Sequence, residues 1–306
     1  MLYKLENTSI NKSEAIKVRI NIQDNYKAGI LLIILASLFF ALMALLVKEV
    51  GHLPLMEIVF FRNIPSMLII PLMIKKTNIS FLGNNRFILF FRSFIGAIAT
   101  IAMFYAYTVM SLTDAITLEQ LSPFFVFFLA GIFLHEKLSL RQLPLFIFAF
   151  LGALLVIKPG LRLDMLPALV ALVGAICAAV SSVTLRHLRM TDHYLVIINY
   201  YAYITGVVSL IILLLQQTFQ LPSLSDCLVL ILLGGIGLLG QIALTKAYQL
   251  APASLISLYN YSQIIFGSVF GLLFFKEIPD IFSISGASFI IISGYLNYRF
   301  TSNKQI

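Results

Sequence analysis

The sequence predicts an all-α integral membrane protein in which ten transmembrane helices form two inverted five-helix repeats. Three observations support this fold class: a composition too apolar for a water-soluble domain, ten long apolar segments, and an internal repeat. Of the 306 residues, 60% are hydrophobic and 11% are charged, whereas soluble domains carry about 25% charged residues. Such a chain needs lipid around most of its surface, and its continuous apolar segments favour helices over the alternating strands of a β-barrel.

Ten apolar segments are long enough to cross a bilayer, which takes about 20 helical residues. Charged residues, Pro or Gly separate these segments, and the connections are short. Pro65, Pro71 and Pro123 fall inside predicted helices, where each frees a backbone carbonyl and permits a bend. We predict helices at residues 28–47, 56–74, 87–109, 113–134, 140–157, 166–185, 194–215, 226–249, 252–275 and 281–300.

These helices divide the chain into three parts. Residues 1–27 are polar and lack the apolar stretch of a cleavable signal peptide, so we expect a mobile cytoplasmic arm. Residues 28–160 hold the first five helices, and residues 161–306 hold the second five with a short C-terminal tail. Because all connections are short, we expect no catalytic soluble domain.

Lysine and arginine residues predict the orientation of the helices. With the N-terminus in the cytoplasm, most loop lysines and arginines are cytoplasmic, and the opposite face receives only Lys48, Lys158, Arg162 and Lys276. The positive-inside rule therefore places both termini in the cytoplasm. The same distribution explains the net charge of +8 without a basic patch, so we expect no nucleic-acid partner.

An internal repeat relates the two halves. At an ungapped offset of 141 residues, identical residues pair as Ile95/Ile236, Gly96/Gly237, Ile101/Ile242, Ala102/Ala243, Ala106/Ala247, Tyr107/Tyr248, Phe133/Phe274, Glu136/Glu277 and Phe148/Phe289. The glutamate pair is the most informative, because it marks the ends of equivalent helices. Each half has an odd number of helices, so the second half crosses the membrane in the opposite sense. Inverted repeats of this kind are typical of secondary transporters, whose substrate site lies near mid-membrane between the halves.

The segment 104–160 also carries a set of family motifs. The motifs are Tyr105-Ala106, Ser122-Pro123, Glu136-Lys137-Leu138-Ser139, Gly152 and Lys158-Pro159-Gly160, preceded by Arg62 in a Phe-Phe-Arg-Asn segment. The second half repeats them loosely as Lys246-Ala247-Tyr248 and Phe275-Lys276-Glu277, with Gln263-Ile264 in place of Ser-Pro. By these residues the chain resembles the drug/metabolite transporter superfamily, specifically its EamA-type ten-helix members, over nearly its whole length after the N-terminal arm.

This resemblance implies a multi-pass protein of the inner (plasma) membrane whose partners are the lipid bilayer and a small-molecule substrate. Family members move amino acids, S-adenosylmethionine, riboflavin, sugars, polyamines or drugs, by import or export. We therefore expect a secondary transporter, either gradient-driven or facilitated, that works by alternating access. Its expected substrate is a small organic metabolite, such as an amino acid, S-adenosylmethionine or another vitamin- or nucleoside-like solute. The alternative is a drug or metabolite efflux exporter. Protons are one candidate coupling ion, and a monomer and a homodimer both stay open.

Two ionisable residues lie deep in predicted helices and are the first candidates for the site. Arg62 is near the middle of helix 56–74, and Glu119 is about two turns inside helix 113–134. At about 1.5 Å per residue, both lie roughly 5–7 Å from the membrane midplane, so they can form an ion pair. A charge at this depth is costly and normally faces a cavity or a partner. A structural salt bridge is one interpretation, and a cavity-lining group that binds a cationic substrate or relays a proton is the other.

The remaining substrate-binding or coupling candidates are polar or aromatic residues at a similar depth: Asn260, Tyr259, Tyr261, Gln263 and Tyr203. The repeat pairs Asn260 with Glu119, so both halves carry a polar group at this position. Each of these side chains could instead bond to or pack against another helix. Arg92 and Lys246 lie near helix ends, where we expect long basic side chains to extend to the interface.

Other function classes lack their sequence patterns. All four histidines lie in predicted loops, and neither HExxH nor GxSxG occurs, so a membrane-embedded enzyme is a remote alternative. A channel needs a repeated selectivity motif and a nucleotide-driven pump needs a P-loop, and the sequence has neither. Cys177 and Cys227 show no metal-binding spacing, so we expect no metal or other cofactor.

The predicted orientation can be tested with reporters fused after Ile306. A fluorescent protein that folds in the cytoplasm should be active there, and alkaline phosphatase, which needs an oxidising compartment, should be inactive. The same reporters fused after Gly51, in a loop predicted on the opposite face, should give the reverse result and serve as the control. The topology is wrong if the fusion after Ile306 is active only outside the cytoplasm.

Overall fold

The computed structural model describes residues 25–134, 142–157, 165–276 and 281–302. Within these ranges every regular element is a helix. Residues 1–24 of the predicted arm lie outside the described ranges, as do the motifs around Glu136, Lys158-Pro159-Gly160 and Glu277.

Each half of the chain supplies five spans. The first half contains α2 (Tyr26–Glu49), α3 (Leu55–Lys76), α4 (Arg86–Val109), α5 (Leu112–Glu119), α6 (Ser122–Phe133) and α7 (Leu143–Ile157). The second half contains α8 (Met165–Leu188), α9 (Tyr194–Gln216), α10 (Leu224–Leu250), α11 (Ala253–Ile256), the 3-10 helix η1 (Ser257–Tyr261), α12 (Ser262–Phe275) and α13 (Ile281–Ser302). Polar side chains set several starting points: Asn25 accepts from the Ala28 N–H at 3.1 Å, and Ser223 caps α10 by accepting from the Asp226 N–H at 3.2 Å.

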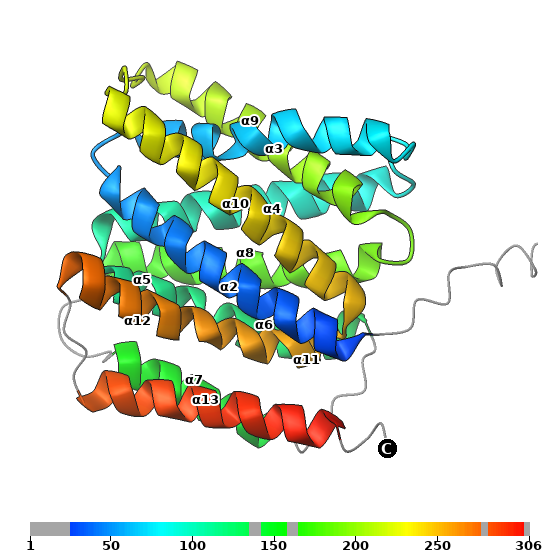
Figure 1. Cartoon of the computed structure of the whole chain (residues 1–306), viewed down its shortest axis with the longest axis vertical. Coiled ribbons are helices and arrows are strands. Elements are labelled where there is room, and N and C mark those ends of the chain that lie inside the picture. The colour runs from blue at the N-terminus through cyan, green and yellow to red at the C-terminus, as the bar shows by residue number, and fades with distance from the viewer. Residues whose placement is uncertain (1–24, 135–141, 158–164, 277–280, 303–306) are drawn as a thin grey trace, which may run out of the picture.

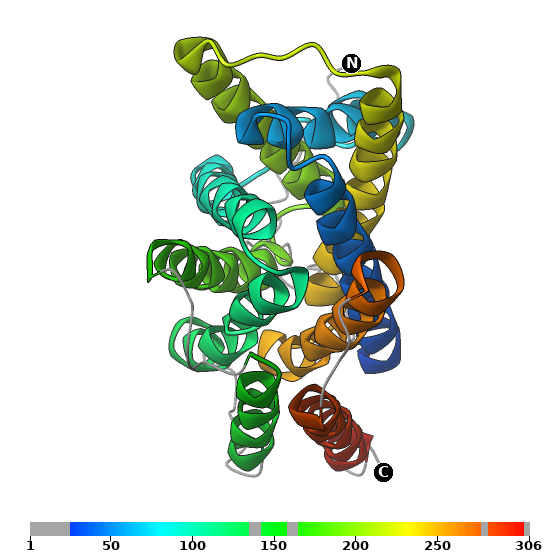
Figure 2. The same ribbon diagram turned by 90° about the vertical axis from the view of Figure 1, so that its left-hand side faces the viewer.

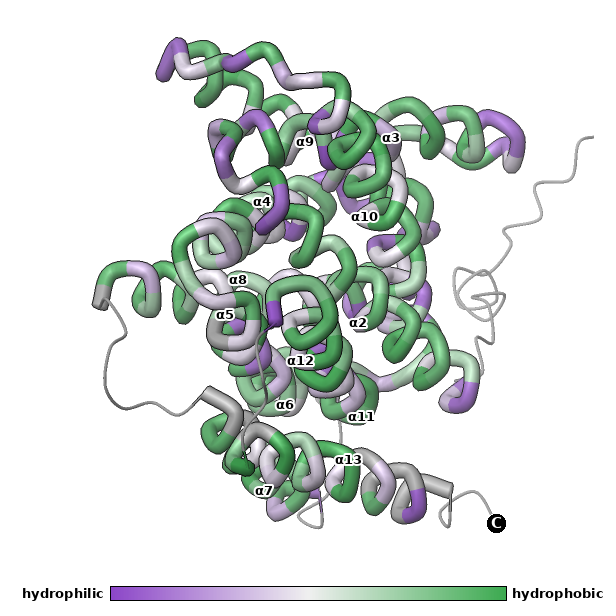
Figure 3. Tube along the Cα trace, turned by 60° about the vertical axis from the view of Figure 1, so that its left-hand side comes forward, coloured by the Kyte–Doolittle hydropathy of each residue, from purple (hydrophilic) through white to green (hydrophobic). Residues whose placement is uncertain are grey.

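Length and apolar composition make these helices membrane spans. Among the described residues, eight segments are long and apolar enough to cross a bilayer; α5 with α6 forms one of them, and α11, η1 and α12 together form another. Helices α7 and α13 add shorter apolar stretches, at Leu143–Gly152 and Ile284–Ser293. Figure 3 shows hydrophobic residues along the spans and hydrophilic ones gathered near their ends. The predicted ten-helix membrane fold is confirmed.

Helix packing follows the internal repeat. Helix α2 packs against α10, and its counterpart α8 packs against α4. The pairs α3 with α9 and α7 with α13 each join a helix to its own counterpart, so they mark the axis that relates the halves (Figure 1). Figure 2 shows α4, α8 and α6 in one column and α10, α2 and α12 in another, with α7 and α13 together at one end. This pattern is that of the predicted inverted repeat.

Two predicted helices are interrupted, which the sequence analysis did not predict. The helix expected at 113–134 separates into α5 and α6. The reason is that Pro123 has no N–H to donate to the Glu119 carbonyl one turn earlier. The helix expected at 252–275 contains the tighter turn of η1. Helix α5 packs against α12, and α6 packs against α11 and η1, so the two interruptions lie at the interface between the halves.

Glycines on α10 allow close packing against α3. A Cβ atom added at Gly234 would lie 2.6 Å from Cγ of Pro65, inside α3, and 3.2 Å from the Phe61 carbonyl oxygen. The neighbouring Gly235 has open space at the same place. Gly234 is therefore the point at which the two helices need a residue without a side chain.

Gly234→Ala should destabilise the protein, because the rigid Pro65 ring cannot rotate away from the new methyl group. Overpacking of this kind costs about 1–3 kcal/mol. Gly235→Ala is the matched control, and its unfolding free energy should stay within about 1 kcal/mol of the wild type, since alanine is the better helix former. Differential scanning fluorimetry in detergent measures both. Equal unfolding midpoints for the two variants would contradict the close α3–α10 contact.

Candidate functional site: a polar cavity between the halves

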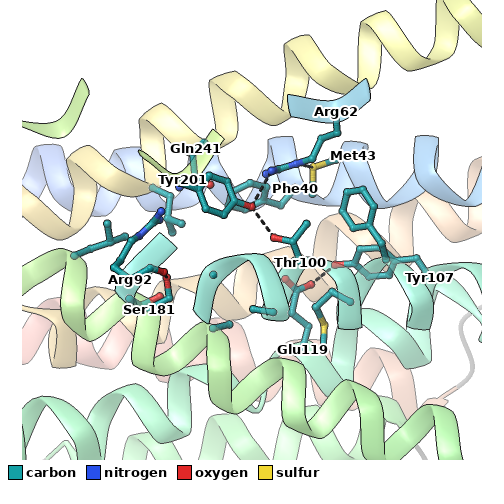
Figure 4. A pocket seen from close by; sticks show the side chains of 18 residues that line it. Phe40, Met43, Arg62, Arg92, Thr100, Tyr107, Glu119, Ser181, Tyr201 and Gln241 are labelled. Atoms are coloured by element: carbon teal, nitrogen blue, oxygen red, sulfur yellow. Dashed lines mark hydrogen bonds between the residues drawn. The ribbon is translucent and has the colours of Figure 1, made fainter. Parts of the chain in front are cut away.

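A cavity of about 110 Å³ lies in the core of the bundle, lined by α2, α3, α4, α5, α8, α9 and α10. Along α4 it reaches from Arg92 to Tyr107, about 22 Å of helix at about 1.5 Å per residue. Figure 4 labels ten of its lining residues: Phe40, Met43, Arg62, Arg92, Thr100, Tyr107, Glu119, Ser181, Tyr201 and Gln241. Helices from both halves thus enclose one narrow polar space.

Two glycines that the repeat pairs make room for the polar side chains of this cavity. A Cβ atom at Gly96 on α4 would lie 3.1 Å from the Ser181 hydroxyl and 3.2 Å from the Tyr201 ring. A Cβ atom at Gly237 on α10 would lie 3.3 Å from Nε of Arg62. All three distances are tighter than ordinary van der Waals contact, so each glycine lets a large polar side chain lie against the helix backbone.

Arg62 lies in the cavity wall but does not form the ion pair predicted with Glu119. Its side chain is 4% exposed, and Nη1 donates to the Tyr201 hydroxyl at 2.8 Å and to Oδ1 of Asn63 at 3.2 Å. The Tyr201 hydroxyl also bonds to the Thr100 hydroxyl at 2.6 Å. Within the described residues no ion pair joins Arg62 to Glu119. The prediction was wrong because depth alone does not specify which way a side chain points around its helix.

Arg92 also lines the cavity, so the expectation that it extends to the interface was wrong. Arg92 is 2% exposed, and its Cζ lies 4.8 Å from the centroid of the Tyr201 ring. Among the described residues, its Nε and Nη1 atoms have no hydrogen-bond acceptor. Lys246, by contrast, is half-buried outside the cavity lining, with Nζ 4.4 Å from the ring centroid of Tyr194 at the start of α9.

Glu119 lies at the other end of the cavity, at the last residue of α5. Its Oε2 accepts hydrogen bonds from the Tyr107 hydroxyl and, at 2.9 Å, from Nε2 of Gln263 on α12. Oε1 of Gln263 accepts from Nε2 of Gln120 at 3.1 Å. Glu119 and the predicted candidate Gln263 therefore belong to one hydrogen-bonded group that spans the interruption in the fourth span and the start of α12.

The other predicted candidates lie away from the cavity. Tyr259 and Tyr261 are buried and Asn260 is half-buried, but none of the three is in its lining. Tyr203 is 40% exposed, and its hydroxyl donates to the Met67 carbonyl at 3.2 Å. Tyr203 cannot face the cavity together with Tyr201, because two residues along a helix turn the side chain through about 200°.

The sequence contains a signal that would have identified the residues missed. On α4, Arg92, Gly96 and Thr100 recur at a spacing of four residues, and all three line the cavity. On α9, Tyr201 begins a similar series, and later members Thr205 and Ser209 are fully buried. Such a spacing places small and polar residues on one helix face, which separates Tyr201 from the lipid-facing Tyr203.

A polar cavity enclosed by two inverted five-helix halves defines a membrane transporter. Sequence comparison then identifies the family: the chain belongs to the EamA-like transporter family, whose profile matches residues 27–158 and 165–299. The resemblance to the drug/metabolite transporter superfamily is confirmed.

Several known proteins are similar to most of the chain. The pseudopaline exporter CntI of Pseudomonas aeruginosa is 34% identical over 88% of this chain and 95% of its own length. Solute carrier family 35 member G1 of Mus musculus is 33% identical over 87% of this chain and 76% of its own length. An S-adenosylmethionine uptake transporter of Rickettsia felis is 24% identical over 77% of this chain and 80% of its own length. A crystal structure at 15% identity superposes with a TM-score of 0.76 over 90% of this chain and 99% of that chain, so it has the same fold.

Tyr201→Phe should lower the thermal unfolding midpoint, because it removes the hydroxyl that bonds to Arg62 and Thr100. A hydrogen bond to a buried charged group contributes about 1.5–3 kcal/mol. Tyr203→Phe, on the outer side of the same helix, is the matched control and should change the unfolding free energy by less than about 0.5 kcal/mol. Both variants can be measured by scanning fluorimetry in the same detergent. A larger effect of Tyr203→Phe would contradict this assignment of the two faces.

Proposed function

We propose that this protein is a secondary transporter that moves a small polar organic metabolite by alternating access. The observation that supports it best is the central cavity: it is lined by two arginines and a glutamate and lies between two inverted repeats. Substrate sites of inverted-repeat transporters lie near mid-membrane between the halves. The sequence has no P-loop, so a solute or ion gradient is the energy source.

The size of the cavity supports alternating access. Its volume is about 110 Å³, whereas pockets for small organic ligands usually measure about 300–1,000 Å³. A metabolite can enter only if helices of the two halves separate. The present structure therefore corresponds to a narrow arrangement, from which the cavity widens toward one face of the membrane at a time.

Loop contacts at the two ends of the bundle are suited to act as alternating gates. At the predicted cytoplasmic end, the Asp192 carboxylate accepts from the backbone N–H groups of Asn84 at 2.6 Å and Asn85 at 3.2 Å, which joins the α8–α9 loop to the start of α4. At the opposite end, Nε2 of His52 lies 3.4 Å from Oδ1 of Asp226. The repeat pairs Asn85 with Asp226, so the two contacts occupy equivalent places in the halves.

Export is the direction that the similar proteins favour. The pseudopaline exporter CntI is 34% identical to this chain, and the S-adenosylmethionine uptake transporter is 24% identical. Uptake of a metabolite is the second candidate direction. Purified protein in liposomes, tested against a panel of labelled metabolites with and without an imposed proton gradient, distinguishes these functions. Absence of flux for every solute under both conditions would contradict the proposal.

Glu119→Gln tests whether this half-buried carboxylate couples transport to protons. If Glu119 takes up and releases a proton in each cycle, the flux of the folded variant should fall at least tenfold. The remaining flux should no longer depend on pH. The reason is that an amide keeps hydrogen bonds to Tyr107 and Gln263 but cannot titrate. Flux per folded molecule is measured in liposomes between about pH 5.5 and 8.5, the range in which general acid–base groups are commonly tuned.

Glu57→Gln is the matched control for this experiment. Glu57 is a fully buried carboxylate on α3, outside the cavity lining, and it accepts from the Gln220 N–H at 3.1 Å. The Glu57 variant should keep both its flux and its pH dependence. Unchanged flux across this pH range in folded Glu119→Gln protein would contradict a role of Glu119 in proton coupling. A loss of folding alone would indicate that Glu119 only stabilises the fold.

A further inference from the structure

We infer that Arg62, Tyr201 and Arg92 form an oxyanion subsite in the cavity, and that the transported solute carries a carboxylate that binds there. The inference rests on the proposed transport function and adds the chemical class of the substrate. Figure 4 shows the Tyr201 side chain between the two arginines, with Arg92 at the end of the cavity away from Tyr107 and Arg62 beside Met43.

Two guanidinium groups flank a single tyrosine ring. The Cζ atoms of Arg62 and Arg92 lie 5.3 Å and 4.8 Å from the centroid of Tyr201. Both arginines are almost fully buried, with exposed fractions of 4% and 2%. Two like charges on the same ring repel each other, and burial removes the water that would screen them. The contacts with the Tyr201 ring offset part of this repulsion, and an anion bound beside the two cations would offset it further.

No carboxylate within the described chain supplies that anion. Among the described residues, Arg62 donates hydrogen bonds only to neutral acceptors: Asn63, Tyr201 and the Met43 sulfur. These bonds do not neutralise its positive charge. Among the lining residues Glu119 is the single acid, and it accepts from Tyr107 and Gln263 instead. The described lining therefore carries an excess of positive charge.

Several hydrogen-bond donors in this wall have no acceptor. Nε and Nη1 of Arg92 and Nε2 of Gln241 are buried, and no partner for them occurs among the described residues. Both residues line the cavity. Buried donors are normally satisfied, and each unsatisfied one carries a cost. A ligand with negatively charged oxygen atoms would accept hydrogen bonds from these donors and would offset the excess of positive charge. Arginine is the side chain best suited to bind carboxylates.

The same oxyanion chemistry could come from a solute or from the phosphate of a lipid headgroup. The position of the subsite favours a solute, because Arg62, Arg92 and Tyr201 open into the central cavity between the halves rather than onto the lipid-facing surface. The experiment below contains one arm for each source.

Arg92→Gln in nanodiscs of phosphatidylcholine tests the subsite, with succinate and glutarate as carboxylate probes and succinamide and glutaramide as neutral counterparts. At constant ionic strength, the dicarboxylates should raise the unfolding midpoint of the wild-type protein in a concentration-dependent manner, and the amides should not. Arg92→Gln should raise the apparent Kd of the dicarboxylates at least tenfold. Lys246→Gln, which also removes one cation but outside the cavity lining, should leave the apparent Kd unchanged.

The anion-free midpoint distinguishes a binding role from a structural one. If the role of Arg92 is to bind an anion, its charge is uncompensated when no anion is present. Arg92→Gln should then unfold at the same temperature as the wild type or higher, because the substitution removes this buried charge. If Arg92 braces the fold through Tyr201, the variant should unfold at a lower temperature. Should Arg92→Gln fail to fold, the structural role holds and the subsite is overturned, unless folded Arg92→Lys weakens dicarboxylate binding at least fivefold through loss of the planar guanidinium.

Three results would overturn the inference. The first is equal stabilisation by dicarboxylates and amides, and the second is an unchanged Kd in Arg92→Gln. The third is an Arg92-dependent rise in the midpoint when phosphatidylglycerol is added to the nanodiscs but not when dicarboxylates are added, which would assign the anion to a lipid headgroup.

Flux assays separate this inference from the transport function. Transport of a solute without any acidic group overturns the subsite alone, and dicarboxylate binding without flux of any solute overturns the transport function alone.

Discussion

The cost of placing a charged side chain against lipid is the constraint on which the rest of this structure depends. Arg62, Arg92 and Glu119 lie in spans that are otherwise almost entirely apolar, and all three turn into the bundle. A bundle that packed these spans without a gap would leave the three groups without partners, at a cost of several kcal/mol each. The helices instead surround a cavity with polar groups in its lining, and the paired glycines Gly96 on α4 and Gly237 on α10 leave room for the polar side chains that lie against them.

The backbone is nearly symmetric, but its chemistry is not. Helix boundaries and helix contacts repeat at the offset of 141 residues, so each half presents the same surfaces to the other. The repeat nevertheless pairs Arg62 with Tyr203, Arg92 with Leu233 and Glu119 with Asn260. The two arginines and the glutamate of the described lining therefore come from the first half, and the second half supplies neutral partners such as Tyr201, Gln241 and Gln263. Inverted symmetry allows the two end states of a transport cycle to resemble each other. The lining itself has no such symmetry, because its charged side chains lie on one half.

The two interrupted spans connect this chemistry to movement. Glu119 lies at the last residue of α5, and Gln263 lies just after η1 near the start of α12. Their hydrogen bond therefore crosses the interface between the halves at the point where neither span is a continuous α-helix. Backbone of this kind is tolerated at membrane depth where it lines a cavity or lies within protein. A change in the protonation or occupancy of the cavity can act here on both halves at once.

The sequence by itself determined the membrane class, the spans and the inverted repeat, because apolar length, lysine and arginine distribution and residue offset are local or periodic properties. It also identified Arg62, Glu119 and Gln263 as candidates, since a charged or amide group deep in an apolar run is visible without coordinates. Only the tertiary structure decided how these groups pair. Arg62 bonds to Tyr201 and not to Glu119, Arg92 turns inward, and Tyr203 faces outward. The physical reason is that depth in the membrane follows from position along a helix, whereas the partner of a side chain depends on how each helix is rotated about its axis, and that rotation is set by packing contacts between residues far apart in the chain.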